Sequence, residues 1–288
     1  MSYQFIEKHS GQFPVSAICR ALSIEKSAYY AYKRRPASAR AQENEILRDA
    51  IKAAYKASFG TYGSPRITDT LKDEGYACSE NRVARIMRES AIVAVTSRKF
   101  KVTTDSDHSL PVAPNLLNRQ FSADAPNKVW LSDITYIYTQ EKWQYLATIM
   151  DSYNREIVGW SLGDSLEAEL VINAFKKAAL KRKIEPGLIF HSDRGSQYAS
   201  YDFKDLLDKY QIQQSMSRKG DCYDNAMMES FFKTLKTELI YPYPYFKTAK
   251  EARVSIFYYI EVFYNRVRKH SALNNMAPIQ YQKLNYAA

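Results

Sequence analysis

Three acidic residues stand where their charge needs an explanation. Asp133 falls in the middle of the strand-like segment "VWLSDITYIYT", and Asp193 follows the apolar run "GLIF" in "HSDRGSQYAS". Glu229 lies in the helix-like segment "YDNAMMESFFKTLKTEL". A charge within a strand is costly unless a partner compensates it. Carboxylate oxygens are the ligands that Mg²⁺ prefers, and pairs of such ions assist phosphoryl transfer, so these residue types indicate that chemistry.

The helix predicted over residues 223–239 divides into an apolar stripe and a polar face, because successive residues turn by about 100°. The stripe expected to pack on a sheet contains Met228, Phe232, Leu235 and Leu239. The neighbouring polar face contains Asn225, Glu229, Lys233 and Lys236. Lys236 is therefore placed two helical turns beyond Glu229 on the same face.

Asp193 and Glu229 also have simpler explanations, and so does Asp151, the acid that competes with Asp133 for a place in the site. Asp193, two residues before Gly195, is typical of an Asx-type turn, and Asp151 in "MDSYNRE" is typical of a hairpin turn. Glu229 and Lys233 have the spacing of an exposed ion pair on a helix. Placement favours the functional interpretation, because one acid lies within a strand, one just past a strand and one on a helix expected to cover the same sheet edge.

The second half of the chain has the order of elements of a ribonuclease-H-like domain. The strand-like segments "KVWLSDITYIYT", "KWQYLATIMD" and "REIVGWSL" come first, joined by short polar turns. A helix over 167–183, the strand "GLIF", a helix over 201–210, a short strand near Ile212 and the helix over 223–239 follow. This order predicts an α/β catalytic domain over 128–240 with a five-stranded mixed sheet, followed by a helical extension over 241–288.

The first half is predicted to be helical and basic. Residues 1–36 are typical of a helix-turn-helix, in which Ser23 caps the second helix and Lys33, Arg34 and Arg35 follow. Residues 41–100 form a second such region, and the proline-containing stretch over 101–127 is predicted to be a linker. The complete chain is thus an α+β multidomain protein.

Three basic residues in the second helical region recur every third position, namely Arg82, Arg85 and Arg88. They share one helix face and are placed to meet DNA phosphates or base edges. A small helical bundle with a solvated basic face is the alternative. The helix with these arginines would have Ser79 as its N-cap. An earlier helix would begin at Ser64 and Pro65 and end at Gly75.

The bulk composition agrees with a nucleic-acid partner. The 288 residues carry 41 Lys and Arg against 31 Asp and Glu, a net charge of +10, although a basic protein without such a partner has the same balance. The three cysteines include no C-x-x-C pair, which argues against a zinc site or a disulfide framework. No apolar stretch is long enough to span a bilayer, so a cytoplasmic location is expected.

The motifs together resemble the second-frame product (OrfB) of bacterial insertion-sequence transposases of the IS-three family. The pieces that carry the resemblance are "YGSPRI", "NRVARIMRE", "NKVWLSDITYI", "HSDRGSQYAS", "DNAMMESFFKTLKTEL" and "YNRVRKHSAL" followed by Pro278. The resemblance implies a DDE triad of Asp133, Asp193 and Glu229, with Lys236 as the basic residue that holds a phosphate. It also implies support from His191, Asn225 and 217–220.

The resemblance further implies a DNA transposase that cleaves strands and transfers a 3′-hydroxyl, using two Mg²⁺ or Mn²⁺ ions per active site. Its partners would be the terminal inverted repeats of the insertion sequence, target DNA, further copies of the chain and an upstream-frame (OrfA) protein. The enzyme would be associated with the nucleoid when bound.

Two other functions stay open at this stage. His191 and Arg194 spell the H-x-x-R of a tyrosine recombinase, and the chain has 23 tyrosines, but a strand-rich domain does not suit that helical catalytic fold. A non-catalytic DNA-binding regulator derived from a transposase would need a broken triad, and all three acids are present.

Overall fold

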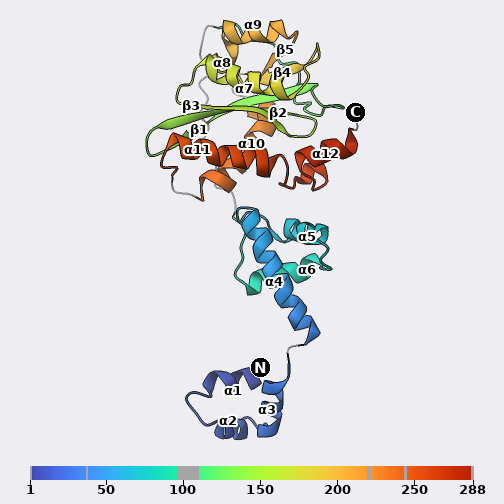
Figure 1. Ribbon diagram of the computed structural model, residues 1–288, viewed down its shortest axis with the longest axis vertical. Coiled ribbons are helices and arrows are strands. Elements are labelled where there is room, and N and C mark those ends of the chain that lie inside the picture. Colours follow the sequence, from blue (N-terminus) through green and yellow to red (C-terminus); the bar gives the residue numbers. More distant parts are fainter. Residues whose placement is uncertain (1, 37, 96–109, 219–221, 243–244, 287–288) are drawn as a thin grey trace. The chain divides into compact units, whose positions relative to one another are not determined.

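The chain divides into two compact units, Met1–Lys52 and Ala53–Ala288. The computed structural model describes residues 2–36, 38–95, 110–218, 222–242 and 245–286 (Figure 1). No helix of these described residues is long and apolar enough to cross a membrane.

The first unit contains three short helices and the start of a fourth. These are α1 (Ser2–His9), α2 (Val15–Ala21), α3 (Lys26–Arg34) and α4 (Ala39–Ala57). A small core of Ile6, Ile18, Cys19 and Tyr29 joins α1, α2 and α3. The predicted cap at Ser23 is wrong, because Glu25 is the N-cap of α3 and Ser23 takes a left-handed backbone with φ 54° in the preceding turn.

The second unit continues after α4 with a pair of helices whose starts and ends are marked by clear sequence signals. They are α5 (Ser64–Asp73) and α6 (Glu80–Glu89). Pro65 lies in the first turn of α5, where its missing N–H costs nothing. The chain leaves α5 through Gly75 at φ +88°, and the Ser79 hydroxyl accepts the Arg82 backbone N–H at 3.3 Å. These caps were predicted and are confirmed.

A five-stranded mixed sheet forms the centre of the second unit, as predicted. Its strands are β1 (Val129–Tyr138), β2 (Trp143–Asp151), β3 (Ile157–Gly163), β4 (Ile189–Ser192) and β5 (Gln213–Met216). Their order is β3-β2-β1-β4-β5. The meander β1–β3 is antiparallel, whereas β4 and β5 run parallel to β1. This topology places the carboxyl end of β4 beside the middle of β1.

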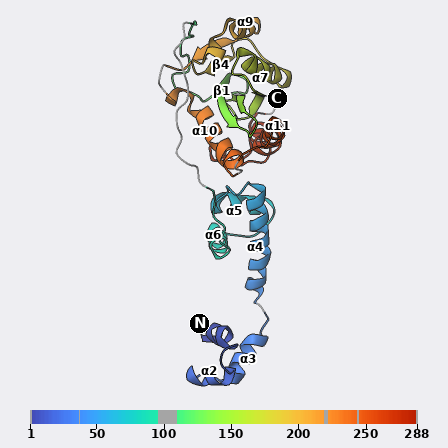
Figure 2. The same ribbon diagram turned by 90° about the vertical axis from the view of Figure 1, so that its left-hand side faces the viewer.

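Helices cover both faces of the sheet (Figure 2). One face holds α7 (Ala168–Lys181), α8 (Ser196–Ala199) and α9 (Tyr201–Lys209). A side chain at Gly159 of β3 would stand 2.4 Å from the Ala174 carbonyl oxygen, so only glycine allows α7 to lie this close to the sheet.

The other face holds a continuous helical stretch that carries Glu229. It consists of a 3₁₀ turn η1 (Cys222–Asn225), α10 (Ala226–Leu235) and a π-helical segment η2 (Lys236–Ile240). The predicted apolar stripe of this helix is buried, from Met228 to Leu239. The change to π geometry at Lys236 was not predicted, and a π segment of this kind is often found at functional sites.

The C-terminal residues complete this second face. They form α11 (Ala249–Phe257), the π segment η3 (Tyr258–Tyr264), the 3₁₀ turn η4 (Ser271–Leu273) and α12 (Pro278–Asn285). Ile256, Tyr259 and Ile260 belong to the same buried cluster as Phe231 and Leu235 of α10. The predicted extension therefore shares its core with the sheet domain.

Part of the predicted linker is also attached to this domain. Residues 110–127 contain no helix or strand, but Leu117 is buried in the core and the Leu116 N–H donates to the Ser215 hydroxyl at 2.9 Å. Residues 101–109 lie outside the described part of the chain. The described part of this segment is thus packed on the sheet rather than free.

Candidate active site

Asp133 and Asp193 are brought together by strand register. Leu131 of β1 pairs with His191 of β4 in parallel register. Continuing that register by two residues places Asp133, in the middle of β1, beside Asp193, just past the end of β4. This is the edge of an α/β sheet where ligands commonly bind.

The electrostatics of Asp133 reflect this juxtaposition. Withdrawal from water raises the pKa of Asp133 well above its ordinary value, the Asp193 carboxylate raises it further, and Glu229 adds a smaller effect. The Ile134 N–H, which donates to Oδ1 of Asp133 at 2.8 Å, and the ammonium of Lys236 act in the opposite direction. The other two predicted acids and the predicted lysine thus all act on the carboxyl group of Asp133.

The turn after β4 is the Asx-type turn that the sequence predicts. The Gly195 N–H donates to Oδ1 of Asp193 at 3.0 Å, and a side chain at Gly195 would place its Cβ 3.1 Å from that oxygen. The turn fixes the carboxylate at the sheet edge. The structural and the functional interpretations of Asp193 are therefore compatible.

Glu229 and Lys236 approach the two aspartates from α10. The side chain of Glu229 is mostly exposed to solvent. The part of it that is withdrawn from water is enough to raise its pKa. Burial lowers the pKa of Lys236 and Asp133 raises it, so the ammonium lies within electrostatic range of that carboxyl group. The predicted pair of Glu229 and Lys233 is wrong, because no ion pair joins them in the described part of the chain and both side chains are exposed.

The donor set suits a hard divalent cation, since two carboxylates are held together in a half-buried position. Among the described residues, however, no three His, Cys, Asp or Glu side chains are gathered closely enough to hold a metal ion as they stand. Glu229 would have to turn toward the two aspartates. Exposed side chains make such rotamer changes within picoseconds to nanoseconds.

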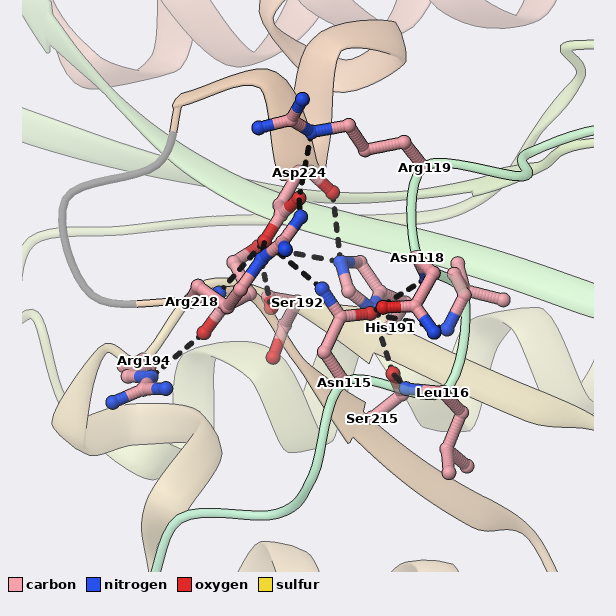
Figure 3. Close-up of polar contacts among 12 residues, drawn as sticks. Asn115, Leu116, Asn118, Arg119, His191, Ser192, Arg194, Ser215, Arg218 and Asp224 are labelled. Atoms are coloured by element: carbon pink, nitrogen blue, oxygen red, sulfur yellow. Dashed lines mark hydrogen bonds and ion pairs between the residues drawn. The ribbon is translucent and has the colours of Figure 1, made fainter.

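His191 lies behind this edge as part of a buried polar network (Figure 3). Its Nε2 lies 2.8 Å from the Asp224 backbone carbonyl oxygen, and its Nδ1 lies 2.8 Å from the Ser215 hydroxyl. Because a carbonyl only accepts, Nε2 carries the proton and the Ser215 hydroxyl donates to Nδ1. Burial lowers the pKa of His191, which favours this neutral form.

Asp224, which the sequence analysis did not single out, is the centre of the network. Its fully buried carboxylate accepts hydrogen bonds from Asn115, from Arg119, and from both the backbone and the guanidinium of Arg218, at 2.9–3.3 Å. The Arg218 hydrogen bond is the largest cause that holds the pKa of Asp224 well below its usual range. The network connects four segments at the start of α10.

Asn225 connects the same helix end to β1. Its amide Nδ2 donates to the Ser132 carbonyl oxygen at 3.1 Å, one residue before Asp133. Ser217, in the predicted supporting stretch, lies 3.2 Å from Nε2 of His191, whereas residues 219 and 220 lie outside the described residues. These contacts give the predicted supporting residues a physical role, which is to fix where α10 begins.

The predicted DNA-contacting residues lie on the surface of the two helical regions. Lys33, Arg34 and Arg35 are exposed at the end of α3. On α6, Arg85 and Arg88 are exposed and Arg82 is half-buried, and Arg85 pairs with Glu89 at 2.8 Å. This pair partly neutralises the predicted basic face.

Comparison with protein families gives three matches. An HTH-like domain matches residues 41–100, and two integrase core domain families match residues 123–222 and 210–278. Transposase InsF for insertion sequence IS3A of Escherichia coli (strain K12) is 40% identical over 289 residues, which cover 100% of both chains. An uncharacterized 31 kDa protein of insertion element IS600 from Shigella sonnei is 43% identical over 92% of this chain and 97% of its own length.

Among solved structures, a chain of the simian T-cell lymphotropic virus intasome aligns with a TM-score of 0.48 at 16% identity, over 82% of this chain and 74% of the other. The HTLV-2 integrase catalytic core domain in complex with magnesium aligns with a TM-score of 0.43 at 16% identity, over 55% of this chain and 97% of the other.

Proposed function

The chain belongs to the IS-three family of insertion-sequence transposases, and from this premise we propose that it cleaves DNA at insertion-sequence ends and joins the resulting 3′-hydroxyl to target DNA. The observation that carries the proposal is the convergence of Asp193, Glu229 and Lys236 on Asp133. Groups of like charge brought together at a sheet edge are unfavourable for stability alone and are typical of catalytic sites.

In this proposal Asp133, Asp193 and Glu229 hold two Mg²⁺ or Mn²⁺ ions. When bound, such ions activate the attacking oxygen and stabilise the departing 3′-oxygen. Lys236 contacts a phosphate oxygen beside the three acids, because a lysine ammonium donates charge-assisted hydrogen bonds to phosphate. Asn225 and the network around His191 hold the start of α10, and from this fixed helix Glu229 turns toward the two aspartates when the ions bind.

The proposed partners are double-stranded DNA, both terminal repeat and target, further copies of the chain, and an upstream-frame protein. The HTH-like region and the net charge of +10 support DNA binding. A tyrosine recombinase fits poorly. His191 of the H-x-x-R motif is 1% exposed with both ring nitrogens engaged, so it is not available to a phosphate.

The test replaces Asp133, Asp193 or Glu229 singly by its amide. Each variant should lose strand cleavage and joining in Mg²⁺ while it keeps its affinity for DNA, because binding rests on dispersed basic residues. Asp164, an exposed acid paired with Lys142, provides the matched control, and its amide should cleave at the wild-type rate. A triad variant that keeps more than about a tenth of wild-type cleavage would remove that residue from the proposed triad.

A further inference from the structure

A basic pocket lies beside α10, apart from the three acids. Met227, Ser230, Phe231 and Thr234 of α10 form one wall, and the rest of the lining includes three arginines and a histidine. These are Arg66 of α5, Arg155 of the turn between β2 and β3, and Arg268 and His270 of the segment after η3. No acidic side chain belongs to this lining among the described residues.

The positive charge of the pocket is only partly neutralised. Arg268 forms a buried pair with Glu238, in which Nε and Nη2 both donate to the carboxylate at 2.8–3.1 Å. Arg66 and Arg155 have no ion pair with a described residue, and the guanidinium of Arg66 lies 5.5 Å from the Tyr62 ring centroid. The backbone of Arg155 is left-handed, with φ 60°, a conformation that is unfavourable for residues other than glycine. Among the described residues, neither Arg66 nor Arg155 has an ion-pair partner of its own, and the Glu238 carboxylate that attracts Arg66 is already bonded to Arg268.

A buried nitrogen without a partner lies in the same pocket. His270 is 7% exposed, one ring nitrogen bonds the Tyr264 carbonyl, and Nε2 has no hydrogen-bond partner among the described residues. A buried polar atom left unpaired is unfavourable for stability, so its persistence needs a reason. A ligand oxygen at this position would satisfy Nε2 and the two unpaired arginines together.

We propose that this pocket binds a phosphate group of a DNA strand through Arg66, Arg155 and His270. The assignment of an anion rests on the pocket alone, whereas the choice of DNA as its source rests on the proposed function. Arginine forks match phosphate oxygens, and Nε2 of His270 donates to a phosphate oxygen once it has gained a proton, because a phosphate within a DNA strand carries no proton of its own and only accepts.

The position of the pocket on α10 suits a strand that leaves the catalytic acids. Thr234 is turned by about 140° from Glu229 around the helix, and the exposed residues Ser230 and Lys233 lie between them. A second hollow shares Arg66, Ser230 and Thr234 with the pocket and reaches the exposed Lys233 of α10. Its lining also includes Glu238, whose carboxylate is bonded to Arg268. A helix is about 10 Å across and a DNA strand rises about 3.4 Å per nucleotide, so the pocket would hold a phosphate about three nucleotides from the cleaved one.

The test compares Arg155→Gln with Arg266→Gln in the full chain. Both variants lose one positive charge, but Arg266 is exposed and outside the pocket, where its Nε donates to the Glu261 carbonyl. Inorganic phosphate, titrated against chloride at constant ionic strength, should bind saturably to the wild type and to Arg266→Gln but not to Arg155→Gln. For a fluorescent DNA duplex, Arg155→Gln should lose about tenfold in affinity and about one unit of salt slope relative to Arg266→Gln. His270→Asn provides a second variant if Arg155→Gln melts below the wild type.

The outcomes separate the parts of the inference. Equal phosphate binding by wild type and both pocket variants would overturn the pocket as an anion site. Loss of phosphate binding in Arg155→Gln with unchanged DNA affinity would assign the pocket to free phosphate and overturn the DNA assignment. A wild type that binds DNA through the pocket but never cleaves it would refute the proposed function and leave the pocket intact.

Discussion

His270 makes the stability of the fold depend on pH. Burial, and then the charges of Arg268, Arg155 and Arg66, lower its pKa to about 2, against about 6.5 in an unfolded chain. The folded state thus excludes a proton that the unfolded state binds. His270 therefore contributes to the free energy of unfolding. This contribution is fully present above pH 6.5 and is lost as the pH falls below that value.

The resulting prediction compares the wild type with His270→Asn in a buffer without phosphate. Between pH 7 and pH 5 the unfolding free energy of the wild type should fall by about 2 kcal/mol more than that of the variant, because only the wild type gains this proton on unfolding. Urea unfolding at both pH values measures the difference. Burial also lowers the pKa of His191. Because both proteins contain His191, its contribution to the pH dependence cancels in the comparison. Parallel changes in the two proteins would show that His270 is protonated in the folded state.

Residue types and placement drew attention to the three acids and Lys236, and their roles stay predictions. Only Asp133 stood where local structure left its charge unexplained, whereas placement and the family resemblance favoured the other three. Residue types and spacing were not enough to assign pairs. Lys233 has the i, i+4 spacing of a partner for Glu229, but it lines the hollow with Arg66, a residue 167 positions away. Such a contact depends on tertiary packing and has no local signal.

At the scale of elements, the beginning of α10 is fixed by Asp224. The carboxylate is fully buried, while the side chains of Arg119 and Arg218 are each 50% exposed. If Asp224 loses its negative charge, the guanidinium groups of Arg119 and Arg218 and the amide of Asn115 have only a weaker acceptor in its place. Asp224 stands five residues before Glu229, which is about one and a half helical turns. If the start of α10 is held less firmly, the position of Glu229 in the proposed site is therefore less well fixed.

Asp224→Asn should therefore lower both stability and strand joining. We expect a loss of about 2–3 kcal/mol, below the 3–5 kcal/mol of a fully buried pair because the arginines are half exposed, and a tenfold or greater loss of joining. Asp164→Asn, which removes an exposed acid from its pair with Lys142, should change neither. Thermal melting and joining of a pre-cleaved DNA end measure the two effects. Normal joining by a destabilised Asp224→Asn would confine this residue to a structural role.

The elements themselves were largely predictable, because alternation in the strands and helical periodicity are local signals. The five-stranded order, the buried stripe of α10 and the caps at Pro65, Gly75 and Ser79 follow from them. The π geometry after Leu235 could not be predicted, since its i→i−5 hydrogen bonds leave no pattern in composition. Asp224 was missed because an aspartate ahead of a helix resembles an ordinary cap.

At the scale of the whole molecule, basic surfaces occur in both compact units. Lys33, Arg34 and Arg35 belong to the first unit, and the helix α6 belongs to the second. The sequence predicted these surfaces from charge and spacing. It did not predict that the C-terminal extension and the described part of the linker pack on the sheet domain, because those contacts join segments far apart in the chain.

If α6 lies along DNA, replacing Arg82, Arg85 and Arg88 by glutamine should weaken binding and reduce the slope of log K against log salt by about two to three units. The loss has two sources, because removing Arg85 also takes an ion-pair partner from the Glu89 carboxylate, which then repels phosphate more strongly. Fluorescence anisotropy of a labelled duplex at several salt concentrations measures the slope.

The matched control removes the same charge from the opposite side of the sheet domain. Lys176 of α7, Lys183 just after it and Lys204 of α9 lie on the helices that cover the face away from α10, and replacing them by glutamine changes the net charge of +10 equally. Long-range attraction depends on that total, whereas release of counterions depends on contact. A reduced slope in the α6 variant alone therefore indicates contact. Equal reductions in the two variants would mean that α6 contributes only to the overall charge and that its arginines face solvent.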